Sequence, residues 1–302
     1  MGLSFVPLSL DLQGAYAARL PLTATRPSMA SFVSLWAWRR EMELSWAWEE
    51  DLVWVRALRP VPCLLPPVGD WDGVEWGSRL RAHFGPRDET FCSIPSELAL
   101  RWHRALPGAI LREEERGEWD YLHRAEDLKI LRGNTFMKKR NKISEFLRDA
   151  GQSLEVFPLA PEHLDEVWRF QERWLRSQED PRGTLAAEHR AIREVFEAWG
   201  HLPTVRGTAI RVRGEIAAYA VGALLDPQTL VVHFEKGEGA LRGSYQAINQ
   251  AFVRQHATPA VTWVNREEDL DDPGLRQAKL SYRPVGFVRK ERVVLKAPPP
   301  PV

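Results

Sequence analysis

Apolar runs and amphipathic segments alternate along the second half of the chain in an order that predicts an α+β domain. After Gly151, apolar runs bounded by turn residues predict strands at 154–157, 207–213, 216–225, 229–234, 260–264 and 286–295. Helical periodicity predicts helices at 161–176, 185–199, 244–254 and from 274 onwards. The turn Arg213-Gly-Glu215 joins two of these strands into a hairpin. The predicted order is β-α-α-β-β-β-α-β-α-β.

The first half carries strands and helices of the same kind and is expected to form a domain of its own. Strands are predicted at 52–58, 90–94, 109–114 and 119–123, and Ser96 caps a helix over 97–105. A chain of 302 residues suits two domains of roughly 150 residues each. We predict an N-terminal arm over 1–27, a domain over 28–132, a basic connecting helix over 133–152, a second domain over 153–296 and a Pro-rich tail over 297–302.

Composition places the chain among globular proteins, with 44% hydrophobic residues, 27% charged residues and no net charge. The longest uncharged apolar run, 216–225, is shorter than the roughly 18–20 residues that a membrane span needs. The N-terminus lacks the basic start of a secretory signal. Cys63 and Cys92 have no metal-ligand spacing and are typical of core thiols in a reducing compartment. We expect a cytoplasmic protein with no metal site and no transmembrane segment.

Positive charge is concentrated in one amphipathic segment. Seven basic residues stand between Lys129 and Arg148, against the single acid Glu145. Several Lys and Arg side chains on one helix can displace counterions from phosphates, which predicts a docking surface for tRNA or another anion. A solvated helix face is the alternative. The candidate anion-binding residues are Lys138, Lys139, Arg140, Asn141 and Lys142.

Ionisable residues follow two of the predicted strands at the points where those strands end. Glu235 and Lys236 follow the strand over 229–234, and Asn265-Arg-Glu-Glu-Asp269 follows the strand over 260–264. Side chains at the carboxyl ends of neighbouring strands meet at one edge of a sheet, where active sites are common. The alternative is a structural ion network of Arg266, Glu268 and Lys279.

Three blocks of sequence carry a family resemblance. They are Tyr121-Leu-His-Arg-Ala-Glu-Asp-Leu-Lys-Ile-Leu-Arg-Gly133 with Lys138-Lys-Arg-Asn-Lys142, then His233-Phe-Glu-Lys236 with Gly243-Ser-Tyr-Gln-Ala-Ile-Asn249, and Asn265-Arg-Glu-Glu-Asp-Leu270 with Gly274-Leu-Arg-Gln-Ala-Lys-Leu-Ser-Tyr282. They resemble soluble relatives of the C-terminal domain of phosphatidylglycerol lysyltransferases. The element order, with Tyr282 a few residues before Gly286-Phe287, is similar to the Gcn5-related N-acetyltransferase (GNAT) superfamily.

The resemblance implies two GNAT-like folds in tandem, each with a mixed, mostly antiparallel sheet flanked by helices. It also implies an acyltransferase that takes an aminoacyl group from aminoacyl-tRNA and needs no further cofactor. The chain lacks the transmembrane region of the lipid-modifying enzymes, so the acceptor is left open between a lipid headgroup, a small molecule and a peptide amine. Peripheral contact with a membrane is included in this expectation.

Roles for individual residues follow from the chemistry of acyl transfer, which needs a base, an oxyanion stabiliser and an acid for the leaving oxygen. Glu267 or Asp269 is the candidate base, or the group that holds the α-ammonium of the donor. Arg266 offsets negative charge, and Tyr282 matches the position of the usual general acid in the family. The candidate donor-binding residues are Glu235, Lys236, Arg242, Gly243, Ser244, Asn265, Arg276 and Lys279.

The loop before the helix at 244 bears on the choice of donor. In GNAT enzymes this loop carries two small residues, so that backbone N–H groups can approach the pyrophosphate of CoA. Here Gly243 stands at the first small position, but Tyr245 occupies the second and Ala240 replaces the usual basic start. The bulky ring disfavours acetyl-CoA. An acyl-CoA-dependent N-acyltransferase and a non-catalytic anion-binding protein remain the alternatives.

Overall fold

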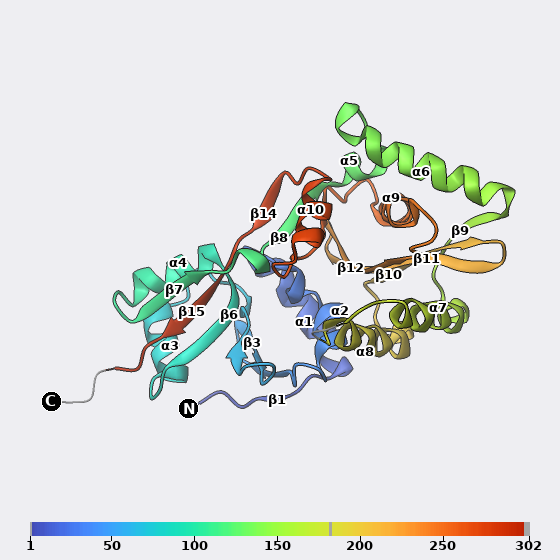
Figure 1. Ribbon diagram of the computed structural model, residues 1–302. Coiled ribbons are helices and arrows are strands. Elements are labelled where there is room, and N and C mark those ends of the chain that lie inside the picture. Colours follow the sequence, from blue (N-terminus) through green and yellow to red (C-terminus); the bar gives the residue numbers. More distant parts are fainter. Residues whose placement is uncertain (1, 181–182, 299–302) are drawn as a thin grey trace. The chain divides into compact units, whose positions relative to one another are not determined.

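The computed structural model describes residues 2–180 and 183–298, and contacts divide this chain into two compact units. The first unit contains residues 2–120, 268–276 and 287–298, and the second contains residues 121–267 and 277–286, apart from 181 and 182. Each unit has its own sheet and its own hydrophobic core. The α+β fold class with two mostly antiparallel sheets flanked by helices is therefore confirmed (Figure 1).

The first sheet has the order β1-β2-β3-β4-β6-β15-β7, and β5 pairs with β3. Its core contains the buried rings of Trp54, Trp71, Trp76 and Trp102, so these tryptophans are core residues, as expected for side chains that bury a large apolar area. The strands of this sheet are β1 (Val6–Pro7), β2 (Ser45–Trp48), β3 (Leu52–Ala57), β4 (Cys63–Leu64), β5 (Val68–Gly69), β6 (Glu89–Pro95), β7 (Ile110–Glu114) and β15 (Lys290–Leu295). Its helices are α1 (Gln13–Arg19), α2 (Phe32–Trp38), α3 (Trp76–Phe84) and α4 (Ser96–Ala105).

The second sheet has the order β14-β8-β13-β12-β11-β10-β9. Helix α9 packs on one face of β10, β11 and β12, while α7 and α8 lie on the other face (Figure 1). The strands of this sheet are β8 (Asp120–Arg124), β9 (Leu154–Pro158), β10 (Val205–Val212), β11 (Glu215–Asp226), β12 (Thr229–Gly237), β13 (Trp263–Asn265) and β14 (Gly286–Val288). The associated helices are α5 (Ala125–Ile130), α6 (Met137–Ala150), α7 (Leu164–Arg176), α8 (Thr184–Glu197), α9 (Ser244–His256) and α10 (Pro273–Leu280).

The predicted hairpin between β10 and β11 is confirmed. Arg213 and Gly214 occupy its two-residue turn, and both have positive φ, at 52° and 82°. Positive φ at both turn positions matches the right-handed twist of the flanking strands, which is why Gly is favoured there. The strand predicted over 229–234 continues to Gly237, so Glu235 and Lys236 lie within β12 and not in a loop.

The single last strand predicted over 286–295 is wrong. It is broken into β14, which belongs to the second sheet, and β15, which pairs antiparallel with β6 and β7 of the first sheet. The contact units therefore do not follow the sequence-based boundaries at this end of the chain. Antiparallel partners far apart in sequence cannot be read from hydrophobic periodicity, because strands of either sheet share the same pattern.

The two chain ends also bear on the predicted organisation. The N-terminal segment over 1–27 contains β1 and α1, and Tyr16 of α1 is buried, with its hydroxyl donating to the carbonyl of Ala30 at 2.8 Å. Residues 299–302 of the predicted tail lie outside the described residues. Within the described part of the chain, no helix combines the length and the apolar character needed to cross a membrane.

Candidate active site

The candidate site lies where β12 and β13 of the second unit part from one another. These parallel strands pair from Thr229 with Trp263 to Val231 with Asn265. Beyond that point, side-chain contacts between residues farther along the two segments replace the backbone pairing. His233 Nδ1 lies 2.7 Å from Glu267 Oε1, and Arg266 Nη2 lies 3.3 Å from Glu235 Oε1. The structure thus brings the two predicted charged segments together.

Glu235 and Arg266 are largely buried, with side chains 14% and 11% exposed. Asn249 of α9 donates from Nδ2 to Glu235 Oε2 at 2.7 Å. Two further atoms of this cluster, Asn249 Oδ1 and Arg266 Nη1, are buried with no hydrogen-bond partner among the described residues. An unmatched buried acceptor and donor are costly, and native structures keep such groups mainly where a ligand or water satisfies them.

The turn after β13 sets the direction of Arg266 and Glu267. Asn265 Oδ1 accepts a hydrogen bond from the backbone N–H of Glu267 at 2.8 Å, and Glu267 has a positive φ of 55°. Lys279 Nζ donates to the carbonyl of Arg266 at 2.5 Å. Asn265 and Lys279 were predicted to bind the donor. Their hydrogen bonds instead hold the backbone that carries Arg266 and Glu267.

Tyr282 lies beside this cluster with two cations against its ring. The guanidinium carbon of Arg266 is 4.6 Å from the ring centroid, and Lys139 Nζ is 4.1 Å from it. Burial raises the pKa of the Tyr282 hydroxyl well above its usual value. The hydroxyl therefore stays protonated at neutral pH, as a proton donor requires.

His123 of β8 also faces Tyr282, with ring centroids 6.5 Å apart in an edge-on arrangement. Burial lowers the pKa of His123 to about 3, and the positive charge of Arg266 lowers it further in the same direction. The imidazole is therefore neutral and adds no third cation to the Tyr282 environment.

Several predicted site residues lie elsewhere. Asp269 belongs to the first unit, is fully buried, and accepts from Arg276 at 2.8 and 2.7 Å and from Arg116 at 3.2 Å. Two arginines thus bind the carboxylate that was a candidate base. One of them is Arg276, which was a candidate donor-binding residue. Glu268 lies in the same unit, 3.5 Å from the buried Lys290.

Lys236 lies on the face of β12 that carries α7 and α8. Its ammonium is 2.6 Å from Glu188 Oε2 and 4.5 Å from the ring centroid of Trp174. Trp174 Nε1 in turn donates to the hydroxyl of Tyr245 at 3.0 Å. These contacts separate Lys236 from the Glu235 cluster, because successive strand residues point to opposite faces.

The loop before α9 is packed shut by other parts of the chain. A Cβ at Gly243 would lie 2.2 Å from the carbonyl oxygen of Lys142, so α6 occupies the space beside this glycine. The N–H of Ser244 is bonded to the carbonyl of Leu241, and the Ser244 hydroxyl donates to the carbonyl of Glu238 at 3.0 Å. Close helix packing and a positive φ of 94° explain Gly243 without a bound phosphate. Arg242 is exposed, 3.5 Å from Glu145.

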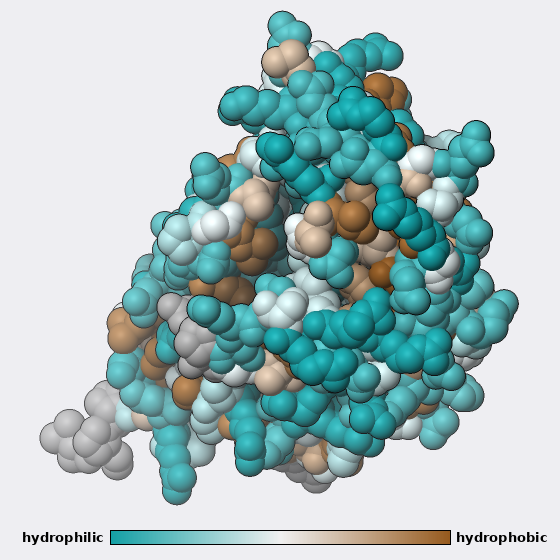
Figure 2. Space-filling view, turned by 45° about the vertical axis from the view of Figure 1, so that its right-hand side comes forward, coloured by the Kyte–Doolittle hydropathy of each residue, from teal (hydrophilic) through white to brown (hydrophobic). Residues whose placement is uncertain are grey.

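The predicted anion-binding residues of α6 divide into two groups. Lys138 and Asn141 are exposed and Lys142 is half-buried, whereas the Arg140 guanidinium donates to the carbonyls of Leu131 and Gly133. Figure 2 shows the top of the molecule, where α6 lies, as predominantly hydrophilic. Lys139 points instead towards Ser281 and Tyr282.

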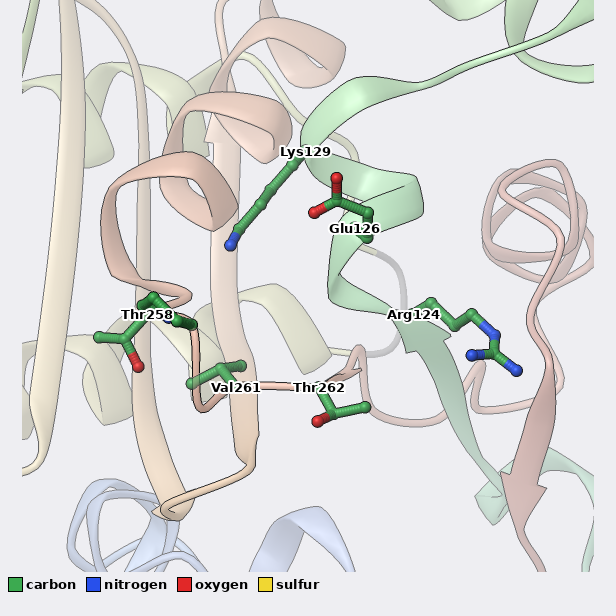
Figure 3. Close-up of a pocket in the computed structure, with 7 residues that line it drawn as sticks. Arg124, Glu126, Lys129, Thr258, Val261 and Thr262 are labelled. Atoms are coloured by element: carbon green, nitrogen blue, oxygen red, sulfur yellow. The ribbon is translucent and has the colours of Figure 1, made fainter.

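A surface depression of about 240 Å³ lies at the other end of the same strands. Residues from the end of β8, from α5 and from the segment before β13 line it, and Figure 3 shows Lys129 extending towards Thr258 while Arg124 points away. It contains none of the predicted site residues. Its position beside the start of β13 separates it from the charged cluster that follows the end of that strand.

The sequence reasoning missed His233, Asn249 and Ser281 as site residues. His233 stands two positions before Glu235, which places both side chains on the same side of a strand that continues past residue 234. That spacing was a usable signal. Asn249 and Ser281 carry no local signal, because only folding brings α9 and the end of α10 to this edge.

The family model described as phosphatidylglycerol lysyltransferase, C-terminal, matches residues 21–290. The chain belongs to this family. A conserved protein of unknown function from Bacteroides thetaiotaomicron VPI-5482 is 26% identical, with a TM-score of 0.86 over 97% of this chain and 100% of that one. No curated protein sequence matches the chain.

Three more distant structures share the fold. The C-terminal domain of a putative lysylphosphatidylglycerol synthetase from Agrobacterium fabrum has a TM-score of 0.66 at 13% identity, over 95% of this chain and 92% of that one. L-PGS from Bacillus licheniformis has a TM-score of 0.64 at 12% identity, over 99% and 95%. FemX, at 8% identity, has a TM-score of 0.62 over 97% of each chain. Family and fold together support a transferase.

Proposed function

We propose that this protein transfers an aminoacyl group from aminoacyl-tRNA to an amine or hydroxyl acceptor. The observation that carries the proposal is the buried cluster of Glu235, Arg266 and the neutral Tyr282, where β12 and β13 part in a fold of the lysyltransferase family. The acceptor is a lipid headgroup, a small molecule or a peptide amine. The family description and the names of the Agrobacterium and Bacillus proteins support this class of reaction.

The cluster supplies an oxyanion donor and an acid for acyl transfer, and Glu267 beside it is the candidate base. The unpartnered Arg266 Nη1 is a donor for the oxyanion of the tetrahedral intermediate, and a charged donor in a buried site stabilises such an oxyanion strongly. Glu235 and the unpartnered Asn249 Oδ1 are acceptors suited to the α-ammonium of the donor. Tyr282, held protonated, is the acid for the departing ribose oxygen.

The closed loop before α9 supports a donor other than acyl-CoA. The carbonyl of Lys142 stands against Gly243, and the Tyr245 ring lies 3.0 Å from where a Cβ of Gly237 would be. Both take up space that the backbone of a CoA-binding loop must leave open for a pyrophosphate. Aminoacyl-tRNA does not require that loop, and the exposed Lys138 offers its phosphates a counter-charge.

The experiment is a deacylation assay with radiolabelled aminoacyl-tRNAs, run with and without a lipid extract as acceptor source. Loss of the aminoacyl group from at least one charged tRNA, above the rate of the Arg266→Ala variant, is expected. If no charged tRNA loses its aminoacyl group, the proposal is refuted. Calorimetric titration with CoA checks the rival donor: heat of binding below millimolar ligand would favour an acyl-CoA enzyme instead.

A further inference from the structure

His233 and Glu267 form a hydrogen-bonded pair across the point where β12 and β13 part. His233 Nδ1 lies 2.7 Å from Glu267 Oε1, and the two side chains are 2% and 23% exposed. An ionised carboxylate only accepts hydrogen bonds, so the proton of this bond is carried by His233 Nδ1. The contact therefore ties a residue of β12 to the turn that follows β13.

The backbone of Glu267 is held in an uncommon conformation. Its φ is 55°, a value that residues other than glycine seldom adopt. Its N–H donates to Asn265 Oδ1 at 2.8 Å, and its carbonyl accepts from the N–H of Tyr121 at 3.1 Å. His233 binds the carboxylate at the far end of the same residue. Backbone strain that the surroundings maintain in this way is typical of active sites.

The charge of the partner distinguishes Glu267 from the other candidate base in the same segment. Asp269 accepts hydrogen bonds from Arg276 and Arg116, which are permanent cations. A cation at this distance stabilises the ionised carboxylate and so makes it a weaker base. An imidazole can donate from Nδ1 without carrying a charge. The His233 contact can therefore orient the Glu267 carboxylate and leave it basic.

We propose that His233 is a positioning residue for Glu267, and that Glu267 is the general base that takes the proton of the acceptor. This inference rests on the proposed aminoacyl transfer and deepens it at the same site. In a Ser-His-Asp triad the carboxylate orients the imidazole, and the imidazole is the base. Here the carboxylate is the more exposed member of the pair, so it is the group that a substrate reaches.

The step balances with two separate proton-transfer groups. Glu267 takes a proton from the attacking amine or hydroxyl as the new bond forms to the carbonyl carbon of the aminoacyl ester. The bond between that carbon and the ribose oxygen then breaks, and Tyr282 gives its hydroxyl proton to the ribose oxygen. Glu267 afterwards loses its proton to solvent and Tyr282 regains one. The aminoacyl group passes directly from donor to acceptor.

The test measures the chemical step separately from binding. Radiolabelled aminoacyl-tRNA is mixed with excess protein and the lipid extract, and single-turnover loss of the aminoacyl group is followed at several protein concentrations. Glu267→Gln should lower the saturating rate by about 100-fold or more and leave the half-saturating concentration unchanged, because a general base acts on the chemical step. His233→Leu should lower the same rate by about 10–100-fold, because a misplaced catalytic group reacts slowly.

Two further comparisons separate positioning from a merely structural contact. His233→Asn keeps an N–H donor close to the position of Nδ1, so it should recover most of the rate that His233→Leu loses. Formate should partly restore Glu267→Ala, because a free carboxylate fits the vacated space, and should restore far less when His233→Leu is also present. Glu162→Gln, at an exposed position of the second unit, is the matched control and should behave like wild type.

The possible results bear on different parts of the inference. A wild-type saturating rate in Glu267→Gln overturns the assignment of the base. Three results overturn the positioning role: equal rates in His233→Asn and His233→Leu, a His233→Leu effect confined to the half-saturating concentration, or formate rescue that does not depend on His233. Failure of the wild type to deacylate any charged tRNA instead overturns the proposed function.

Discussion

The guanidinium of Arg266 and the ammonium of Lys139 both lie against the ring of Tyr282, at 4.6 and 4.1 Å from its centroid. Arg266 comes from the turn after β13 and Lys139 from the first turn of α6, so the ring joins two distant segments. A cation against an aromatic face contributes roughly 0.5–2 kcal/mol, depending on how dry the contact is. The ring of Tyr282 is thus a structural platform, while its hydroxyl remains available for chemistry.

Tyr282→Phe should separate these two roles. The ring and both cation contacts remain, so the melting temperature should change little. Transfer should fall by about 10²–10⁴-fold, because that is the usual contribution of a general acid. Tyr282→Ala should in addition destabilise the protein by about 3–5 kcal/mol through the lost aromatic packing. Wild-type activity in Tyr282→Phe would show that the hydroxyl is not the acid.

Gly243→Ala should be strongly destabilising. The added methyl group would meet the Lys142 carbonyl at 2.2 Å, and φ at this position is 94°. Strain and overpacking together should cost about 2–4 kcal/mol, measured by denaturant unfolding. Gly239→Ala is the control in the same loop, because nothing lies within 4 Å of the new methyl group. Equal stability of the two variants would mean that α6 does not pack against this loop in solution.

His123 should make the protein less stable in mild acid. Its pKa is about 3 in the folded protein and about 6.5 in an unfolded chain, so the unfolded state binds a proton that the folded state rejects. Its effect on stability is therefore constant above about pH 6.5 and becomes more unfavourable as pH falls towards 3. Between pH 6.5 and 5 the loss should be on the order of 1–2 kcal/mol.

His123→Gln should flatten this pH dependence of the free energy of unfolding. Urea unfolding at each pH measures it. The matched control is His103→Gln, which changes an exposed histidine of the first unit and should keep the wild-type slope. An unchanged slope in His123→Gln would assign the acid sensitivity to other groups.

The exposed face of α6 should contribute to tRNA affinity through charge alone. Lys138→Ala with Lys142→Ala should weaken tRNA binding at low salt and reduce the slope of log affinity against log salt by about one per lysine. The melting temperature should stay unchanged. Arg140→Ala should instead lower stability, because its guanidinium donates to two backbone carbonyls. An unchanged salt slope in the double variant would exclude this face of α6 as the docking surface.

Much of the second unit could be predicted from sequence because its elements are local. The hairpin needed only Arg213 and Gly214 between two apolar runs, and helix α9 needed only its amphipathic pattern after Gly243. The charged residues 265–269 were also visible as a group. They did not share one environment, since Arg266 and Glu267 lie with β12 while Asp269 is buried between arginines of the first unit.

The sequence by itself determined the α+β class, the order of strands and helices from β9 to α10, and the charge on β12 and after β13. These depend on hydrophobic period and turn chemistry, which act over a few residues. Only the tertiary structure decided that β15 returns to the first sheet, that α6 closes the loop at Gly243, and that Lys139 meets Ser281. Contacts between distant segments depend on which surfaces exclude water together, and no local pattern encodes that choice.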